Sequence, residues 1–424
     1  MAGRGLITGI DYSDRYCQAC YYNARHYRPE SVSAGTDMRR YLIPSVLCYD
    51  TGKDEWVIGD AAVRLSSEEN VRTFSRFMEH IKRSDTAEVN GREYSYVHLM
   101  AIFFSKLFEH IRIVTSVMNI DSVTVTMSNP DRDARDIFEQ IFEMLKIPSE
   151  SVKLLSPAEC FGYFITNEPE QYWKDGALLF EFGQQGFFVK QMTVSAAGGK
   201  RTVNINEFDL SGDFSVGSLA SEMLREQLDR KLFNLYNDLI SESGSCSVFF
   251  TGDGFNDNWF STTLQGISAN HRAFRGSNIY VKGACLAGHR RYNSKPDEFL
   301  MLCPGRTRVS VSAAVWDKGR LKEMLLSPAA VNWYDAEFKG DFILEGERSI
   351  VFVVASAVSG RKTPVELELT DFGDRPVKAT RAGLSVRYQS EKECVLTVVD
   401  KGFGDIYPDG TAEVTGSITT SDYE

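Results

Sequence analysis

The stretch Leu6-Ile7-Thr8-Gly9-Ile10-Asp11 is a short apolar run that ends in a carboxylate. After a polar turn, a second apolar run extends from Tyr16 to Tyr22. Two apolar runs joined by a short polar turn are typical of a β-hairpin, in which the second strand returns beside the first. The sequence therefore predicts that the chain opens with a strand, a turn and a strand, and that Asp11 stands where the first strand ends.

A second hairpin of the same kind is predicted in the middle of the chain. There, Ala177 to Phe182 and Phe187 to Val194 are apolar runs on either side of a turn at Gly183 to Gly186. Each hairpin is followed by strands and helices in α/β style. The two halves therefore echo one another, which indicates an internal duplication.

Further strands and helices are predicted between and after the hairpins. From Tyr96 to Ile111, apolar residues recur at helical spacing, which predicts a core helix. Val123 to Met127 is an apolar strand, and an acidic first turn then predicts a helix from about Asp131 to Leu145. The other predicted elements are strands at Tyr41–Tyr49, Glu55–Ile58, Ser151–Leu155 and Ser247–Phe250, and helices near Ala158–Phe164, Val216–Ile240 and Ile279–Gly288.

The last third of the chain has a different pattern. After Lys295-Pro296-Asp297, alternating apolar and polar segments are separated by Gly, Pro and Asp turns. Alternation with a period of two predicts strands that bury one face. Examples are Val309–Ser312, Val351–Val353, Val365–Leu369 and Val395–Val398. We therefore expect an all-β module there, with the architecture of a sandwich.

The composition limits the classes of partner. Of 424 residues, 43% are hydrophobic and 25% are charged, which is ordinary for a globular protein of two or three domains. Lys and Arg sum to 47 against 58 for Asp and Glu, which gives a formal charge of -11. Such a chain lacks a general attraction to phosphate backbones or anionic lipid, so neither nucleic acid nor a membrane is an expected partner.

Cysteine usage and the amino terminus bear on the cellular compartment. Residues 1–8 lack the apolar core of a signal peptide, and no stretch approaches the roughly 20 apolar residues that span a bilayer. The eight Cys are scattered, as free thiols in a reducing compartment are. Cys17 and Cys20 form a C-x-x-C, but positions three apart on a strand point to opposite faces. A cytoplasmic protein is expected, without a metal or redox role for this pair.

The order of several short motifs resembles the actin, sugar kinase and heat-shock ATPase superfamily, and within it the seventy-kilodalton heat-shock chaperones. Gly9-Ile10-Asp11 with its hairpin is similar to the first phosphate loop, Glu181–Gly186 to the second, and Phe249–Gly254 to the adenosine motif. The further matches, which extend the resemblance over about residues 5 to 290, are Ile43–Val46, Ile58–Ala62, Val123–Pro130, the connecting motif Leu154–Glu159, and Lys282–Ala284 in a closing helix.

This resemblance implies an α/β actin-like ATPase fold over residues 1–292, made of two ribonuclease-H-like lobes at about 1–155 and 156–292. Residues 297–304 resemble the apolar linker by which these chaperones couple nucleotide state to peptide binding. Residues 305–424 resemble the β-sandwich that binds the peptide in this family.

The resemblance also implies positions that would contact ATP, but these positions depart from the family. Where the family has Gly-Thr-Thr, this chain has Ser13, Asp14 and Arg15, so a carboxylate would face a polyanion. Gln184 and Gln185 replace small residues that let the backbone approach phosphate. ATP binding is therefore expected to be weak or absent. The full set of implied positions is Asp11, Ser13, Asp14, Arg15, Gly183, Gln184, Gln185, Gly186, Gly252, Asp253 and Gly254, of which Gly252 and Gly254 are also typical of a tight turn.

The catalytic candidates are two carboxylates. Asp11 could direct Mg²⁺ through water, and a turn-capping role is the alternative. Glu181 stands where the family has Asp and is longer by one methylene. Ser156 stands where the family keeps a carboxylate for metal-bound water. Arg76, in the helix-like run Val71–Ile81, falls near a catalytic lysine of the family or is an exposed helix residue. The hydrolytic set is incomplete, so we expect a degenerate ATPase rather than an enzyme.

Length gives a further argument. Gly217 and Ser247 stand about 30 positions apart, whereas the family has a sizeable helical lobe there that forms one wall of the adenine pocket. We expect this sub-lobe to be reduced. The expected function is that of a chaperone-like protein that binds a protein or peptide through its β module. Two alternatives stay open, an ATP-binding chaperone with an altered site and an actin-fold assembly scaffold.

Overall fold

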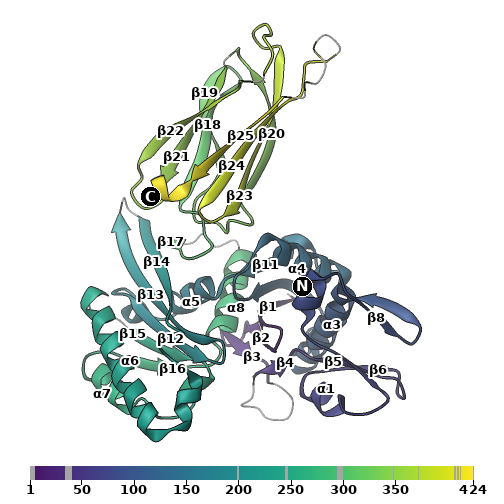
Figure 1. The fold of residues 1–424 in the computed structure, drawn as a ribbon, viewed down its shortest axis with the longest axis vertical. Coiled ribbons are helices and arrows are strands. Elements are labelled where there is room, and N and C mark those ends of the chain that lie inside the picture. The colour runs from purple at the N-terminus through teal and green to yellow at the C-terminus, as the bar shows by residue number, and fades with distance from the viewer. Residues whose placement is uncertain are drawn as a thin grey trace. The chain divides into compact units, whose positions relative to one another are not determined.

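The computed structural model describes residues 5–33, 41–197, 200–243, 247–293, 299–346, 348–370, 372–404, 407, 410 and 412–423. The contacts divide the chain into two units, Met1–Phe299 and Leu300–Glu424 (Figure 1). Within the described residues, no helix is both long and apolar enough to cross a membrane. Residues 297 and 298 of the predicted linker lie outside the described ranges.

The first unit is built around two mixed sheets. In the first sheet, β1 (Leu6–Tyr12) pairs antiparallel with β2 (Tyr16–Asn23), which confirms the opening hairpin. β1 also pairs in parallel with β10 (Ile120–Thr126), which confirms the strand predicted at Val123–Met127. The order is β11-β10-β1-β2-β3, with β4 paired to β2, where β3 covers Arg28–Ser31, β4 Ile43–Pro44 and β11 Val152–Leu155.

The second sheet repeats this arrangement with later strands. β12 (Ala177–Gly183) pairs antiparallel with β13 (Gly186–Ala197) and in parallel with β15 (Ser247–Thr251). From β16 to β14, the strand order and directions match those from β11 to β3. The full order is β16-β15-β12-β13-β14-β17, where β14 covers Lys200–Asp209, β16 Ala273–Arg275 and β17 Phe299–Leu302.

Two helices connect the sheets, because each follows a strand of one sheet and packs against the other sheet. α5 (Pro157–Ile165) follows β11 of the first sheet, yet its Phe161 packs edge-on against Phe249 of β15, with ring centroids 6.1 Å apart. α8 (Ile279–Tyr292) follows β16 of the second sheet and packs against β1 and β10 of the first. A Cβ on Gly283 of α8 would lie 1.9 Å from the carbonyl oxygen of Cys160 in α5. Glycine is therefore required where these two helices cross.

Other helices cover the face of the first sheet opposite Asp11. The ring of Tyr12 lies 5.8 Å from Phe104 of α3 and 5.8 Å from Phe138 of α4. The remaining elements of the first unit complete its edges. Together with α3 (Tyr96–Thr115) and α4 (Arg132–Met144), the elements not yet named are the helices α1 (Gly59–Leu65), α2 (Phe77–Lys82), α6 (Glu222–Ser243) and α7 (Ser261–Asn270), the strands β5 (Leu47–Asp50), β6 (Glu55–Ile58), β7 (Val71–Phe74), β8 (Thr86–Val89) and β9 (Arg92–Ser95), and the short 3-10 helices η1 (Ser149–Ser151), η2 (Glu170–Tyr172), η3 (Val216–Ala220) and η4 (Asp253–Phe255).

Three predicted elements differ from the structure. The helix-like run 71–81 is β7 followed by α2, because Arg76 adopts a left-handed backbone (φ 51°) that interrupts it. The helix predicted from Val216 begins at Glu222, after η3. The strand predicted over 41–49 is divided into β4 and β5, because Ser45 between them turns to donate to the carbonyl of Ser13 at 2.7 Å.

The second unit contains two sheets, in the orders β19-β18-β21-β22 and β20-β23-β24-β25. Along β23, Ala382, Leu384, Val386 and Tyr388 are buried and alternate with more exposed residues. They pack with residues such as Val311 of the other sheet in one hydrophobic core. The elements are β18 (Val309–Asp317), β19 (Arg320–Ser327), β20 (Glu337–Leu344), β21 (Ser349–Ser356), β22 (Lys362–Glu368), β23 (Thr380–Ser390), β24 (Glu393–Asp400), β25 (Glu413–Thr419) and η5 (Thr420–Tyr423).

Candidate functional site

Asp11 lies near the carboxyl end of β1, on the face of the first sheet against which α8 packs. Its register partners are Gln18 on β2 and Thr126 on β10, so the three side chains stand in one row. Gln18 donates through Nε2 to the carbonyl of Ser277 at 3.2 Å. The buried oxygens Gln18 Oε1 and Thr126 Oγ1 have no hydrogen-bond partner among the described residues. Asp11 is thus flanked by two buried oxygens that lack donors.

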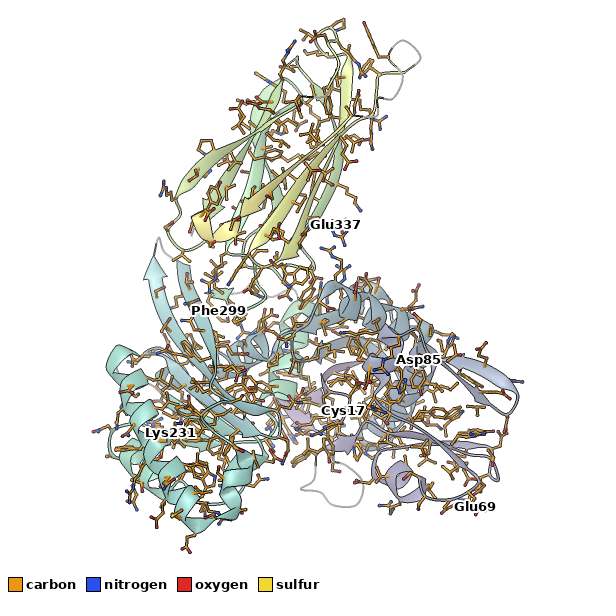
Figure 2. The ribbon with its side chains drawn as sticks, viewed as in Figure 1. Cys17, Glu69, Asp85, Lys231, Phe299 and Glu337 are labelled. Atoms are coloured by element: carbon orange, nitrogen blue, oxygen red, sulfur yellow. The ribbon has the colours of Figure 1, made fainter. Side chains whose placement is uncertain are left out.

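Burial and the neighbouring Glu181 raise the pKa of Asp11 to about 7, and Lys190 only partly opposes this rise. The rise means that the charged carboxylate is poorly solvated and faces a like charge. The same surroundings affect Cys17 on β2 (Figure 2), since burial and the Asp11 carboxyl raise the pKa of its thiol. The effect of Glu181 on Asp11 brings the two predicted catalytic carboxylates into one electrostatic cluster.

Glu181, on β12, is held by groups that belong to the second sheet and to α8. Lys190 Nζ lies 3.0 Å from Glu181 Oε2 and 3.2 Å from Glu207 Oε2. The hydroxyl of Tyr280 donates to the same Glu181 oxygen. Burial disfavours the charged form of Lys190, but the carboxylates of Glu181 and Glu207 outweigh it and raise its pKa above 10.5. Glu181 is therefore neutralised inside the protein by a lysine that is only 2% exposed.

The turn at Ser13, Asp14 and Arg15 is closed by local bonds. Asp14 accepts from the backbone N–H of Met78 at 3.0 Å and of Glu79 at 3.2 Å. Since these are first-turn groups of α2, Asp14 caps that helix. The expectation that its carboxylate would face a polyanion is therefore corrected: its oxygens are occupied by helix N–H groups.

The other residues of this turn are also engaged or exposed. Ser13 Oγ donates to the carbonyl of Tyr16 at 2.9 Å, which tightens the hairpin. The carbonyl of Arg15 accepts from the N–H of Ser45 at 3.0 Å, while the Arg15 side chain is exposed. Between Ser13 and Arg15, the hydrogen bonds therefore stabilise the hairpin itself.

The second turn is a tight hairpin loop. Gly183 pairs with Gly186, and Gln184 and Gln185 between them are exposed. Ser211 Oγ accepts from the N–H of Phe187 at 3.0 Å, and its oxygen lies 2.0 Å from where a Cβ of Gly186 would be. Ser211 therefore fills the space where a Cβ of Gly186 would stand, so glycine is required at this position.

The Gly252–Gly254 segment packs on Phe182 at the end of β12. Gly252 has φ +96°, and a Cβ there would lie 2.2 Å from the Phe182 carbonyl oxygen. Trp259 Nε1 donates to the carbonyl of Gly254 at 2.7 Å. Asp253 lies beside the second turn, since its Oδ1 would be 2.7 Å from a Cβ on Gly183. The interpretation of these glycines as a tight turn is confirmed.

Ser156, at the connecting motif, caps α5. Its Oγ accepts from the N–H of Glu159 at 3.2 Å, and Glu159 Oε2 accepts from the N–H of Ser156 at 3.1 Å. This reciprocal pair is a capping box. In the part of the chain that the structure describes, no three His, Cys, Asp or Glu side chains gather as a metal ligand set. The Mg²⁺ prediction therefore stays with Asp11 alone, with Gln18 and Thr126 as neutral oxygen neighbours.

Sequence reasoning missed four residues of this cluster: Gln18, Thr126, Lys190 and Tyr280. Lys190 carried a signal, because a lysine that follows Phe187-Phe188-Val189 in a buried strand needs a charge partner. The other three are ordinary strand or helix residues, and only their register across strands marks them.

The fold and site together define a mixed α/β unit with a repeated sheet and a partly buried carboxylate cluster, followed by a β unit. Residues 28–304 match the family described as the C-terminal part of a family of unknown function (DUF5716), and the chain belongs to this family. Residues 306–420 match a domain of unknown function (DUF8552). No curated protein matches the chain.

Proposed function

We propose that this protein is a chaperone-like member of the heat-shock ATPase superfamily that acts by binding extended peptide or protein segments through its second unit, without a nucleotide cycle. The proposal rests chiefly on one observation, an exposed apolar face on the β19-β18-β21-β22 sheet. The repeated strand order of the first unit and the packing of α5 and α8 across the two sheets are consistent with two duplicated lobes.

The apolar face is the side of this sheet that points away from the core. Its most exposed members are Trp316 at 60%, Leu321 at 61%, Leu325 at 55% and Val351 at 47%. Trp316 and Leu321 are direct cross-strand partners. Large apolar side chains gathered on one exposed face are typical of interaction sites.

The opposite sheet offers a contrast within the same unit. On its outward face, Asp341 forms ion pairs with Arg381 and, at 2.7 Å, with Lys401. Charged side chains held in pairs resist the removal of water by a partner. The outward face of the first sheet also carries an ion pair, Glu323–Lys362 at 2.8 Å, but it exposes more large apolar side chains, which favours it as the binding surface.

Next to the apolar face, one edge of β18 is partly unpaired. β18 pairs with β21 only as far as Ala313 and Phe352, whereas β18 continues to Asp317 with β19 as its partner. Within the described residues, β18 has no strand partner after Ala313 on the edge that faces β21. Open N–H and C=O groups can pair with an extended segment, and the neighbouring side chains can select its sequence.

The first unit supports the loss of a nucleotide cycle. Asp14 is used as a helix cap, Ser211 fills the space at Gly186, and Glu181 is paired with Lys190. We expect ATP to bind no more tightly than about millimolar, roughly −4 kcal/mol. Calorimetric titration with ATP and Mg²⁺ measures this affinity. Micromolar binding would favour the alternative of an ATP-dependent chaperone.

The decisive experiment is fluorescence anisotropy of labelled, extended apolar peptides with the full chain. Replacing Trp316 and Leu321 together by Ser should weaken binding at least about tenfold, because buried aromatic anchors dominate such interfaces. Ile343→Ser is the matched control, since Ile343 is 55% exposed on the other sheet. ATP should leave the affinity unchanged. Absence of peptide binding by the wild-type chain would contradict the proposal and favour an assembly scaffold.

A further inference from the structure

A polar cavity lies in the first unit, away from the carboxylate cluster. It has a volume of about 150 Å³ and is lined by residues that include Tyr172, Asp175, Ser247, Asn270 and Arg272. These residues stand at or just before the amino ends of β12, β15 and β16, which run in parallel. Glu181 lies toward the other end of β12, and a seven-residue strand spans roughly 20 Å. The cavity is thus a separate place in the fold.

The basic side of the cavity is the solvent-exposed Arg272. The guanidinium carbon of Arg272 lies 4.7 Å from the ring centroid of Tyr172, in cation–π contact. That contact uses the flat face of the guanidinium and leaves its in-plane N–H groups for a carboxylate. Among the described residues, no hydrogen bond or ion pair engages the Arg272 side chain. It is therefore ready to receive an anionic group.

The acidic side of the cavity is formed by Asp175 and the end of α7. Asp175 is exposed, and its one ion pair with a described residue is a long contact, 3.9 Å, with the exposed Lys174. Asn270, another lining residue, is the last residue of α7, and a helix carries partial negative charge at its carboxyl end. A positively charged group is therefore favoured on this side of the cavity.

Neutral hydrogen-bonding groups lie between these two sides. Over the ranges that the structure describes, the side chains of Gln171, Ser247 and Asn270 make no hydrogen bond to protein. Together they offer a hydroxyl and two amides, which can donate and accept. The imidazole of His271 also lines the cavity. A cavity with an arginine, a carboxylate, an imidazole and neutral polar groups fits a small ligand that carries both charges and a polar remainder.

We propose that this cavity binds a free amino acid, with its α-carboxylate on Arg272 and its α-ammonium on Asp175. The size of the cavity suits one such molecule rather than a nucleotide or a peptide. This binding is independent of the peptide-binding function of the second unit.

The test uses saturation-transfer NMR of the full chain with each free proteinogenic L-amino acid in turn. The best binder is then compared with its α-amide, which lacks the carboxylate, and its N-acetyl derivative, which lacks the ammonium. Arg272→Met should weaken binding roughly tenfold and abolish the preference over the α-amide. Asp175→Asn should abolish the preference over the N-acetyl derivative. Arg272→Lys should restore part of the affinity.

Matched controls test whether the effects are local. Arg201→Met removes another arginine that contacts an aromatic ring, Trp173, outside the residues that line the cavity. Asp213→Asn removes another exposed carboxylate. Both should leave amino-acid binding unchanged, and equal unfolding midpoints should show that every variant folds.

Three results would overturn the proposal. One is the absence of binding by every amino acid up to ~10 mM. Another is binding that Arg272→Met and Asp175→Asn alter no more than the controls do. The third is a combination of two findings: inorganic phosphate displaces the amino acid at equal concentration, and Asp175→Asn leaves amino-acid binding unchanged. That combination would show a simple anion-binding site.

Discussion

Asp11 on β1 and Glu181 on β12 occupy corresponding strands of two sheets with the same order, yet their surroundings differ. Glu181 has a built-in cation, Lys190, at 3.0 Å and a hydroxyl donor from Tyr280. Asp11 has two register neighbours whose buried oxygens lack donors, and its pKa rises to about 7. A repeated fold therefore need not repeat its chemistry: one carboxylate is paired with a lysine, whereas burial and a like charge raise the pKa of the other.

The largest expected effect comes from removing that lysine. Lys190→Met leaves Glu181 and Glu207, whose side chains are 28% and 34% exposed, without their shared cation. Because water can partly solvate both carboxylates, the cost in unfolding free energy should lie near the lower end of the about 3–5 kcal/mol that breaking a fully buried pair costs. Urea denaturation at neutral pH measures the change. Lys231→Met is the control, because Lys231 on α6 (Figure 2) is exposed and its pair with Asp213 should contribute about 1 kcal/mol or less.

A second substitution sharpens this result. Adding Glu181→Gln and Glu207→Gln to Lys190→Met should recover part of the lost stability, because no uncompensated charge then remains. If Lys190→Met costs no more than Lys231→Met, the cluster does not neutralise Glu181 as described.

The next effect concerns the proton on Asp11. The folded pKa of about 7 lies above the ordinary value of 3.8, so the native state binds more protons than the unfolded state between these values. Wild-type stability contributed by Asp11 is therefore fully present below pH 4 and is lost as the pH rises to 7. The Asp11→Asn variant has no ionisable group at this position, so its stability does not fall with pH in this way. The variant should gain on the order of 2 to 4 kcal/mol relative to the wild type between pH 4 and 8.

Denaturation curves of both proteins across this pH range, with and without Mg²⁺, test the comparison. A constant difference at all pH values would show that Asp11 is ionised throughout. A pH dependence that disappears on addition of Mg²⁺ would instead indicate that a cation, rather than a proton, neutralises this carboxylate.

A smaller effect is expected at the first turn. Asp14→Ala removes the acceptor for the N–H groups of Met78 and Glu79, and loss of a helix cap costs about 1–2 kcal/mol. Asp14→Asn keeps one acceptor oxygen and should lose less. Thermal unfolding ranks the three proteins. If Asp14→Ala is as stable as the wild type, the carboxylate is free for another role.

The smallest effect is expected at the connecting motif. Ser156→Ala breaks the capping box with Glu159 and should cost about 1 kcal/mol. Ser156→Asp keeps a capping oxygen and restores the carboxylate that the resembling family has, so its stability should stay near that of the wild type. An Asp variant that gains ATP hydrolysis in a turnover assay would contradict the proposal that the protein works without a nucleotide cycle.

Local signals were sufficient for much of the fold. The apolar runs Leu6–Asp11 and Ala177–Phe182 predicted the leading strands of both hairpins, because strand pairing across a short turn depends on neighbouring residues. Asp131 predicted the start of α4, where its Oδ1 accepts from the N–H of Ala134 at 2.7 Å. β14, with its polar alternation from Lys200, was missed because its long pairing with β13, rather than its own sequence, stabilises it.

The candidate site was predictable only in part. The sequence by itself determined that Asp11 and Glu181 end similar strands, since each follows an apolar run before a turn. The tertiary structure alone decided what these carboxylates face. Strand register brings Lys190 and Gln18 to these carboxylates, and the packing of α8 brings Tyr280; local sequence sets neither. Electrostatic environment depends on distances in space, so residues remote in the chain determine which carboxylate carries a charge.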